Sequence, residues 1–289
     1  MRVSRSSLTF GGLVLLTTAL MGSSFAIGKI GLAFISPFLL VGLRFVIAGG
    51  MMALWVRHQR HPQTRSEWGH ILIIGLFQTT GVMGLIFLSL KTISAAESSI
   101  LTFTNPLLVV ILATAFAGAR YRIRQWLGVA MGFGGVLVTL GGHLTLHAGT
   151  VYGFSGALSW AIATLLIKRW GPSLDIWVLT AYQMLFGGIV LLMGSVVLET
   201  PMFIITAESV FVLLWLAVMA SVVQFGIWFY LLQHGDPGRV STFLFLAPFF
   251  GVLFGWLLLQ EPIAGGTLIG GSLIILGIAL VNWPARITT

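Results

Sequence analysis

The chain has 289 residues, of which 57% are hydrophobic and only 8% are charged. Charged residues make up about a quarter of an average soluble domain, so these few charges cannot cover a globular surface of this length. The absence of cysteine excludes a disulfide scaffold, a cysteine zinc site and a thiol nucleophile. We attribute the net charge of +8 to loops at a membrane surface rather than to a nucleic-acid partner. The composition therefore predicts an all-α membrane protein.

Ten apolar stretches are each about long enough to span a bilayer, which takes about 20 helical residues. They cover residues 8–27, 38–56, 70–90, 94–117, 126–142, 151–168, 176–197, 209–232, 240–259 and 266–283. The first has a basic start and a possible cleavage sequence at Ser24-Phe25-Ala26, as a secretory signal would. We interpret it as a retained helix, because the second half of the chain contains a counterpart.

Lysine and arginine are unevenly divided between alternate loops. If the amino terminus is cytoplasmic, 12 of the 15 lie in inside segments, and only Lys29 and Lys91 lie outside. The remaining one, Arg44, lies within the second span. Positive residues accumulate on the cytoplasmic side of a membrane, so this bias predicts that both termini are cytoplasmic.

The two halves of the chain resemble each other. Asn105-Pro106-Leu107 aligns with Ala247-Pro248-Phe249 at a shift of 142 residues, and nearer the start a shift of 139 aligns Leu39–Met51 with Val178–Val190. The 142-residue shift pairs Gly128 with Gly270 and Gly135 with Gly277, and the 139-residue shift pairs Lys29 with Lys168 and Gly49 with Gly188. We interpret residues 1–142 and 150–289 as two repeats of five helices. Because five is odd, the second repeat would be inverted, as is typical of secondary transporters.

Several short motifs recur at corresponding places in these repeats. They are Met21-Gly22-Ser23-Ser24-Phe25 ahead of Lys29, Trp160 ahead of Lys168, Ser94–Ser99 leading to Pro106, Val240-Ser241-Thr242 leading to Pro248, and Gln260-Glu261-Pro262. With these residues the chain resembles the drug/metabolite transporter superfamily, in its ten-span EamA-type branch. One departure is Gly118-Ala119-Arg120, where family members often carry a Gly-Glu pair.

Four residues are candidates for gating or hinge roles. Pro106 and Pro248 lie inside apolar stretches, where each removes a backbone donor. Such a break survives in a membrane where a cavity or side chains satisfy the freed carbonyl; a static kink is the alternative. For Lys29 and Lys168 the resemblance implies a gate or structural role, and interfacial anchoring is the alternative.

Polar and aromatic residues on several spans could form a substrate chamber. Ser98, Thr102 and Asn105 follow a helical spacing that places them on one face, while their counterparts in the second repeat are apolar. Hydrogen bonding between helices would explain the same pattern. The residues expected to line the chamber are Met21, Ser24, Gln78, Ser98, Thr102, Asn105, Trp160, Thr164, Ser221, Gln224 and Trp228.

Buried charge is scarce in the spans. Arg44 is the clearest case, and its partner could be Glu97, although the side chain could instead extend to the membrane surface. Because the spans have no acidic residue near their middle, the coupling ion stays open. The sequence contains no nucleotide-binding or hydrolase motif and no convincing set of metal ligands, so we expect neither an enzyme nor a cofactor.

These observations favour a secondary transporter that exports a small organic metabolite across the inner membrane by alternating access. The leading substrates are apolar or aromatic amino acids. The alternatives are a multidrug or other metabolite carrier and, in a different class, a non-transporting membrane subunit or an embedded enzyme. The fifth and tenth spans carry small-residue motifs at Gly128–Gly132 and Gly266–Gly270. These motifs favour packing within a monomer, and otherwise a weak homodimer through the same helices.

Overall fold

The computed structural model describes residues 5–139, 147–234 and 246–282, and over these residues the chain is helical. The first half contains α1 (Arg5–Gly31), α2 (Pro37–Trp55), η1 (Val56–His58), α3 (Arg65–Gly75), η2 (Leu76–Gly81), α4 (Val82–Leu90), α5 (Ala95–Thr102), α6 (Asn105–Ala117) and α7 (Ile123–Thr139). The second half contains α8 (Ala148–Trp170), η3 (Gly171–Ser173), α9 (Ile176–Leu198), α10 (Ala207–Leu214), η4 (Trp215–Val223), α11 (Gln224–His234), α13 (Leu246–Leu259) and α14 (Gly265–Asn282).

Seven helical segments of the described chain are long and apolar enough to cross a membrane by length and composition. Continuous segments include α3–η2–α4 and α10–η4–α11, each of which corresponds to one predicted span. Three further helices, α7, α13 and α14, are shorter. Part of the predicted ninth span, residues 240–245, lies outside the described residues.

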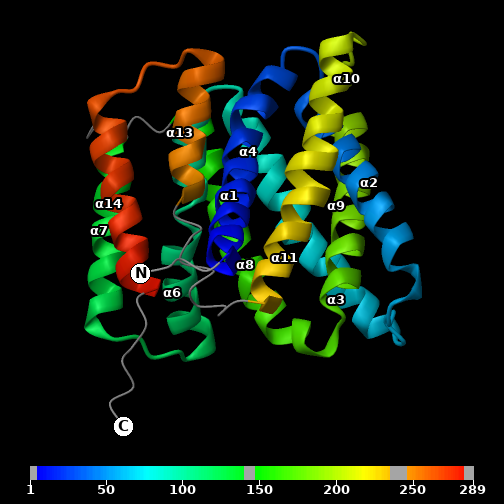
Figure 1. Cartoon of the computed structure of the whole chain (residues 1–289), viewed down its shortest axis with the longest axis horizontal. Coiled ribbons are helices and arrows are strands. Elements are labelled where there is room, and N and C mark those ends of the chain that lie inside the picture. Colours follow the sequence, from blue (N-terminus) through cyan, green and yellow to red (C-terminus); the bar gives the residue numbers. More distant parts are fainter. Residues whose placement is uncertain (1–4, 140–146, 235–245, 283–289) are drawn as a thin grey trace.

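The helices run roughly along one common direction (Figure 1). The paired helices α7 and α14 lie at one end of the long axis, α2, α3 and α9 lie at the other, and α1 and α8 lie between them. Large apolar side chains such as Leu54, Phe116 and Val197 are more than two-thirds exposed on the outside of this bundle. A surface of this kind suits contact with lipid rather than water.

The loops with most of the basic residues lie at one end of the bundle, the lower end in Figure 1. They are the segment between α2 and α3 and the segment between α6 and α7, and the basic pair Lys168 and Arg169 in the last turn of α8 lies at the same end. The first of these ends in a helix cap, in which Thr64 and Glu67 each accept a hydrogen bond from the other's backbone N–H. We refer below to this lower end as the basic end.

The predicted fourth span is broken in its middle. α5 ends at Thr102 and α6 begins at Asn105, so Pro106 lies in the first turn of α6 and not deep inside a continuous helix. The first turn tolerates proline, because its backbone N–H would have no helical partner there. Pro248 lies close to the start of the described helix α13. The break at Phe103-Thr104 ends the continuous helical face that was expected to run through Ser98, Thr102 and Asn105.

Glycines bring two pairs of helices into close contact. A Cβ atom on Gly49 of α2 would lie 2.5 Å from the backbone nitrogen of Leu185 in α9, and one on Gly188 would lie 2.8 Å from that of Val46. A Cβ atom on Gly128 of α7 would likewise meet the carbonyl of Gly277 in α14 at 2.5 Å. One on Gly135 would meet the carbonyl of Gly270 at 2.6 Å. In both pairs the residue numbers rise along one helix as they fall along the other, so each pair is antiparallel.

Candidate functional site

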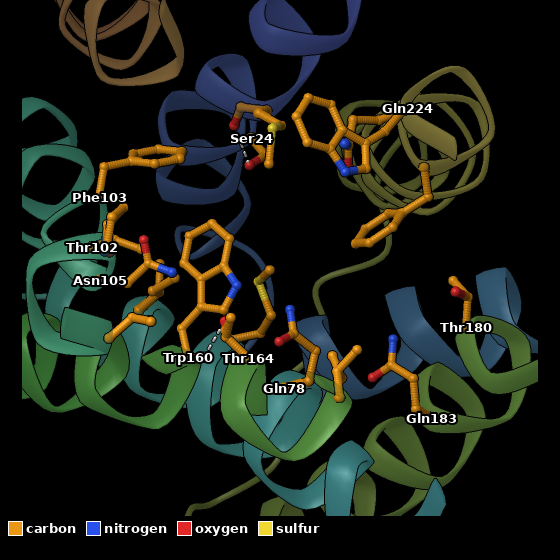
Figure 2. Close-up of a pocket in the computed structure, with 18 of the residues that line it drawn as sticks. Ser24, Gln78, Thr102, Phe103, Asn105, Trp160, Thr164, Thr180, Gln183 and Gln224 are labelled. Carbon is orange, nitrogen blue, oxygen red and sulfur yellow. Dashed lines mark hydrogen bonds between the residues drawn. The ribbon is translucent and has the colours of Figure 1, made fainter. Parts of the chain in front are cut away.

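A cavity of about 490 Å³ lies inside the bundle and is walled by both halves of the chain (Figure 2). Its lining comes from α1, α2, η2, α4, the α5–α6 break, α8, α9, η4 and α11, together with the ends of α7 and α14. Nine of the eleven residues expected to line a chamber do line it. They are Met21, Ser24, Gln78, Thr102, Asn105, Trp160, Thr164, Gln224 and Trp228.

Ser98 and Ser221 do not line the cavity. Ser98 is fully buried and shares a hydrogen bond with Ser89 on α4, so it joins two helices of the first repeat. Ser221 donates to the carbonyl of Leu216 and accepts from Arg44. Ser98 shares the helix of Thr102, but its hydroxyl is bound to Ser89 and does not reach the cavity. Ser221 is occupied by Arg44, a charged partner that was not expected there.

One wall of the cavity is aromatic and lies at the break between α5 and α6. Phe103, in the break itself, packs edge-to-face on Trp160 of α8 at 5.6 Å and lies 6.1 Å from Phe25 of α1. Asn105 and Thr102 flank these rings (Figure 2). Neither phenylalanine was predicted as a site residue, because aromatic residues are common on lipid-facing surfaces of spans.

The other wall carries amide side chains. Gln78 lies on η2, Gln224 begins α11, and Gln183 lies on α9 beside Thr180 (Figure 2). Gln183 accepts a 2.6 Å hydrogen bond from Thr79, whereas the buried Oε1 of Gln78 has no partner in the described structure. Gln183 was missed, although the repeat alignment gives a signal for it: the 139-residue shift places it opposite Arg44.

Arg44 is only 2% exposed and lines the cavity on α2. Its Nε donates to Ser221 Oγ at 2.9 Å and its Nη2 donates to the carbonyl of Ala220 at 2.8 Å, both on η4. The expected pairing with Glu97 is wrong, because Glu97 instead accepts from the backbone N–H and hydroxyl of Ser94 at the start of α5. The alternative, extension to the membrane surface, is also wrong, because the side chain is buried.

η2 and η4 are π-helical turns at corresponding places in the two repeats. A π-turn shifts the backbone hydrogen bonds by one residue, and such turns often occur at functional sites. Here each turn presents residues to the cavity, Gln78 from η2 and Ala220 from η4. The backbone carbonyl of Ala220 also accepts from Arg44. Hydrophobic patterning contains no signal for these turns.

An ion pair lies at the end of the bundle opposite the basic end. Lys29 Nζ, at the end of α1, is 2.9 Å from Glu261 Oε1 in the segment between α13 and α14. Lys29 also donates to the carbonyl of Ile93. The carboxylate of Glu261 accepts from the backbone N–H groups of Ala95 and Ala96 at the start of α5. Charged groups thus join α1, the start of α5 and the α13–α14 segment.

The cavity extends away from this ion pair. Its lining includes Tyr121 and Gln125 near the start of α7, and Ile167 and Ile176 around the α8–α9 connection, which lie toward the basic end. None of the residues that form the Lys29–Glu261 cluster lines it. Lys168, the counterpart of Lys29 in the repeat alignment, is exposed at the end of α8.

The small-residue motifs of the fifth and tenth predicted spans lie at the α7–α14 contact within one chain. Gly128 and Gly277 approach each other there, as do Gly135 and Gly270. This contact uses the glycines that could otherwise bring two copies of the chain together. A homodimer through these helices would have to use their outward faces.

Comparison with known proteins identifies the family. The EamA-like transporter family matches the chain twice, over residues 9–141 and 147–283. An "Uncharacterized transporter" of Archaeoglobus fulgidus is 30% identical over 93% of this chain and 96% of its own length. A "Probable amino-acid metabolite efflux pump" of Escherichia coli is 27% identical over 93% of each chain.

A solved structure, titled "Crystal structure of protein", shows the same fold. It superposes with a TM-score of 0.66 at 22% identity and covers 96% of both chains. The apolar helices of the described chain and the two family matches together indicate a multi-pass membrane protein. The chain therefore belongs to the EamA-like transporter family.

Proposed function

We propose that this protein is a secondary transporter that exports small organic metabolites, foremost apolar or aromatic amino acids, across the inner membrane. The observation that carries the proposal is the cavity of about 490 Å³, whose lining combines aromatic rings with amide side chains. Binding sites for small molecules have volumes of about 300–1,000 Å³ and combine an apolar lining with a few polar groups. The names of relatives from Escherichia coli and Salmonella typhimurium, both "Probable amino-acid metabolite efflux pump", support the substrate class.

We further propose ten spans arranged as two inverted repeats, residues 1–142 and 150–289. The glycine contacts support this arrangement, because they are reciprocal under the repeat alignment. Gly128 corresponds to Gly270 and Gly135 to Gly277, and the contacts join Gly128 to Gly277 and Gly135 to Gly270. A two-fold relation produces such reciprocity. Since corresponding helices pair antiparallel, that two-fold axis would lie across the helices, as inverted repeats require.

The two different ends of the cavity support a mechanism of alternating access. The Lys29–Glu261 cluster joins three elements at one end, while the cavity extends toward the basic end. The positive-inside rule assigns the basic end to the cytoplasm, and on the same rule we propose that both termini are cytoplasmic. The structure would then be a state closed to the outside, from which closure at the basic end and opening at the ion pair would release the solute. The Thr102–Asn105 break is our candidate hinge.

The direct test uses the purified protein in liposomes loaded with labelled L-phenylalanine or L-leucine, with and without a pH gradient. We expect efflux that saturates with substrate concentration. Efflux of hydrophobic organic cations in place of amino acids would instead support a multidrug carrier. No flux of any solute would overturn the transporter proposal in favour of a non-transporting membrane protein.

A pair of tryptophan variants links flux to the cavity. Trp160→Ala removes the ring that packs on Phe103 at the cavity wall, whereas Trp256→Ala removes a half-exposed ring on the outside of α13. We expect the first variant to lose most of the phenylalanine flux and the second to retain it. Equal flux through both variants would mean that the solute passes elsewhere.

A further inference from the structure

We propose that Arg44 binds an anionic group of the transported solute, so that the substrates of this carrier are compounds that carry a carboxylate. This inference rests on the proposed function, since it assigns a chemical class to the solute that occupies the cavity. The guanidinium group of Arg44, on α2, would hold that solute in the cavity.

Arg44 is an unbalanced charge inside the bundle. It is the one residue with a formal charge among the described residues that line the cavity. Its contacts are with neutral groups: the hydroxyl of Ser221, the carbonyl of Ala220 and the ring of Phe45, which lies 4.8 Å from the guanidinium carbon. Burial of a charge away from water is unfavourable unless a counter-charge offsets it. An anion in the cavity would supply that counter-charge.

The guanidinium also retains an unused donor. Nε and Nη2 bind η4, but Nη1 is buried and has no hydrogen-bond partner in the described structure. Guanidinium groups bind carboxylates through parallel N–H donors, which gives both strength and directionality. Because Nη1 is shielded, pairing requires a small movement of Arg44 or of the Ala220 turn. A carrier that changes conformation during its cycle can make such a movement.

The second repeat shows that the charge is not needed to join the helices. Under the repeat alignment Gln183 corresponds to Arg44, and Thr79 corresponds to Ser221. Gln183 and Thr79 form the equivalent hydrogen bond between α9 and η2, at 2.6 Å. A neutral glutamine therefore makes the same connection in one repeat that arginine makes in the other. The positive charge at position 44 has no counterpart and requires a separate explanation, which an anionic ligand provides.

The rest of the cavity suits an amphipathic acid. The rings of Phe103 and Trp160 offer an apolar surface, and the unpartnered, buried Oε1 of Gln78 can accept from an ammonium or hydroxyl group after a small rotation of its amide. An amino acid would then place its carboxylate toward Arg44 and its side chain among the rings. The ammonium group is the less critical of its two charged groups, because no acidic residue lines the cavity among the described residues.

Three related probes separate these groups on the purified wild-type protein. L-phenylalanine carries both charges, N-acetyl-L-phenylalanine keeps only the carboxylate, and L-phenylalaninamide keeps only the ammonium. We expect the first two to bind, measured by thermal stabilisation or calorimetry, and L-phenylalaninamide to bind at least about tenfold more weakly, because it forfeits a hydrogen-bonded charge pair. Equal binding of the amide and the acids would overturn the proposal.

Variants at position 44 test the same point. Arg44→Gln reproduces the residue of the second repeat, so we expect it to fold and to lose the preference for acids over the amide. Arg44→Lys retains the charge and should retain part of that preference. Arg57→Gln, which alters an exposed arginine at the basic end, is the control and should behave as wild type.

The outcomes distinguish the two proposals. If Arg44 only joins helices, Arg44→Gln would change thermal stability but leave the ratio of acid to amide binding unchanged, and the inference would fail. If Arg44→Gln does not fold, the three probes on the wild type still decide. Wild-type protein that transports both phenylalanine and its amide equally well would contradict the anion site and leave the transporter proposal intact. Absence of flux for every solute would contradict the transporter proposal itself.

Discussion

At the scale of single residues, the amides of the cavity divide into two kinds. Gln183 and Gln224 are within hydrogen-bonding distance of threonines, Thr79 and Thr17, at 2.6 and 3.5 Å. The buried Oε1 of Gln78 has no partner in the described chain. A buried polar atom without a partner is costly, so this amide would gain a hydrogen bond if a small rotation turned its oxygen toward a ligand in the cavity. The paired amides contribute to the packing of the helices.

This division predicts that Gln78→Leu weakens substrate binding without unfolding the protein. The loss of one neutral hydrogen bond corresponds to about a twofold to tenfold rise in the apparent Kd, measured by calorimetry with L-phenylalanine. Thermal stability should stay at or above that of wild type, because the variant removes an unpaired buried oxygen. Gln63→Leu, in an exposed loop at the basic end, is the matched control and should leave both quantities unchanged.

The polar part of the cavity lining was largely predictable, because amides near the middle of apolar spans are rare enough to be informative. Gln78 and Gln224 are examples, and both line the cavity. The partner of Arg44 was not predictable from spacing along one helix. It depends on the contact between α2 and η4, which are about 175 residues apart in the chain.

At the scale of helices, apolar length predicted where the helices lie, but not where they change form. The predicted spans 70–90 and 209–232 contain the π-turns η2 and η4, and the predicted span 94–117 is two helices. The local cause of this last break is partly visible in the sequence, since Pro106 cannot continue the hydrogen bonds of α5. The π-turns have no such marker, because their neighbours come from elsewhere in the fold. η2 packs against α8 and α9, and η4 packs against α2 and accepts the hydrogen bond from Arg44.

The close contact of α7 and α14 predicts opposite effects for two adjacent glycines. A Cβ atom on Gly135 would lie 2.6 Å from the carbonyl of Gly270, whereas Gly134 has nothing within 4 Å. Gly135→Ala should therefore destabilise the protein by about 1–3 kcal/mol, as over-packing does. Gly134→Ala should be neutral or slightly stabilising, because alanine is the better helix former. Thermal unfolding in detergent measures both, and equal stability of the two variants would contradict the contact.

At the scale of the whole molecule, most charges lie at the two ends of the bundle, and among the described residues that line the cavity only Arg44 is charged. The basic loops lie at one end, and the segment between α13 and α14 lies at the other (Figure 1). Glu261 of this segment pairs with Lys29. Its surroundings favour this ion pair: the two side chains are 31% and 12% exposed, and Glu261 also accepts from two N–H groups at the start of α5. Those N–H groups favour negative charge at a helix start. Breaking the pair should free α1 from the α13–α14 segment and admit water to the cavity from that end.

Because the chain has no cysteine, single-cysteine reporters can test this closure directly. In Ser24→Cys the thiol lies on the cavity wall, in Thr92→Cys it is exposed at the ion-pair end, and in Gln59→Cys it is exposed at the basic end. A membrane-impermeant maleimide should label position 24 from the side that labels position 59, and much less from the side that labels position 92. The two exposed positions also report which side of the membrane each end faces.

Adding Glu261→Gln to the Ser24→Cys protein should raise labelling from the side of position 92, because the neutral amide loses both the pairing with Lys29 and the charge that the start of α5 favours. The exchanged pair, Lys29→Glu with Glu261→Lys, should restore closure only in part. It recreates the ion pair, but a lysine at 261 cannot accept from Ala95 and Ala96.

If Glu261→Gln leaves labelling unchanged from both sides, the end of the cavity is closed by apolar packing and the ion pair is not its gate. Full restoration by the exchanged pair would assign the closure to the Coulomb attraction alone, whereas no restoration would assign it to the acceptor contacts with α5.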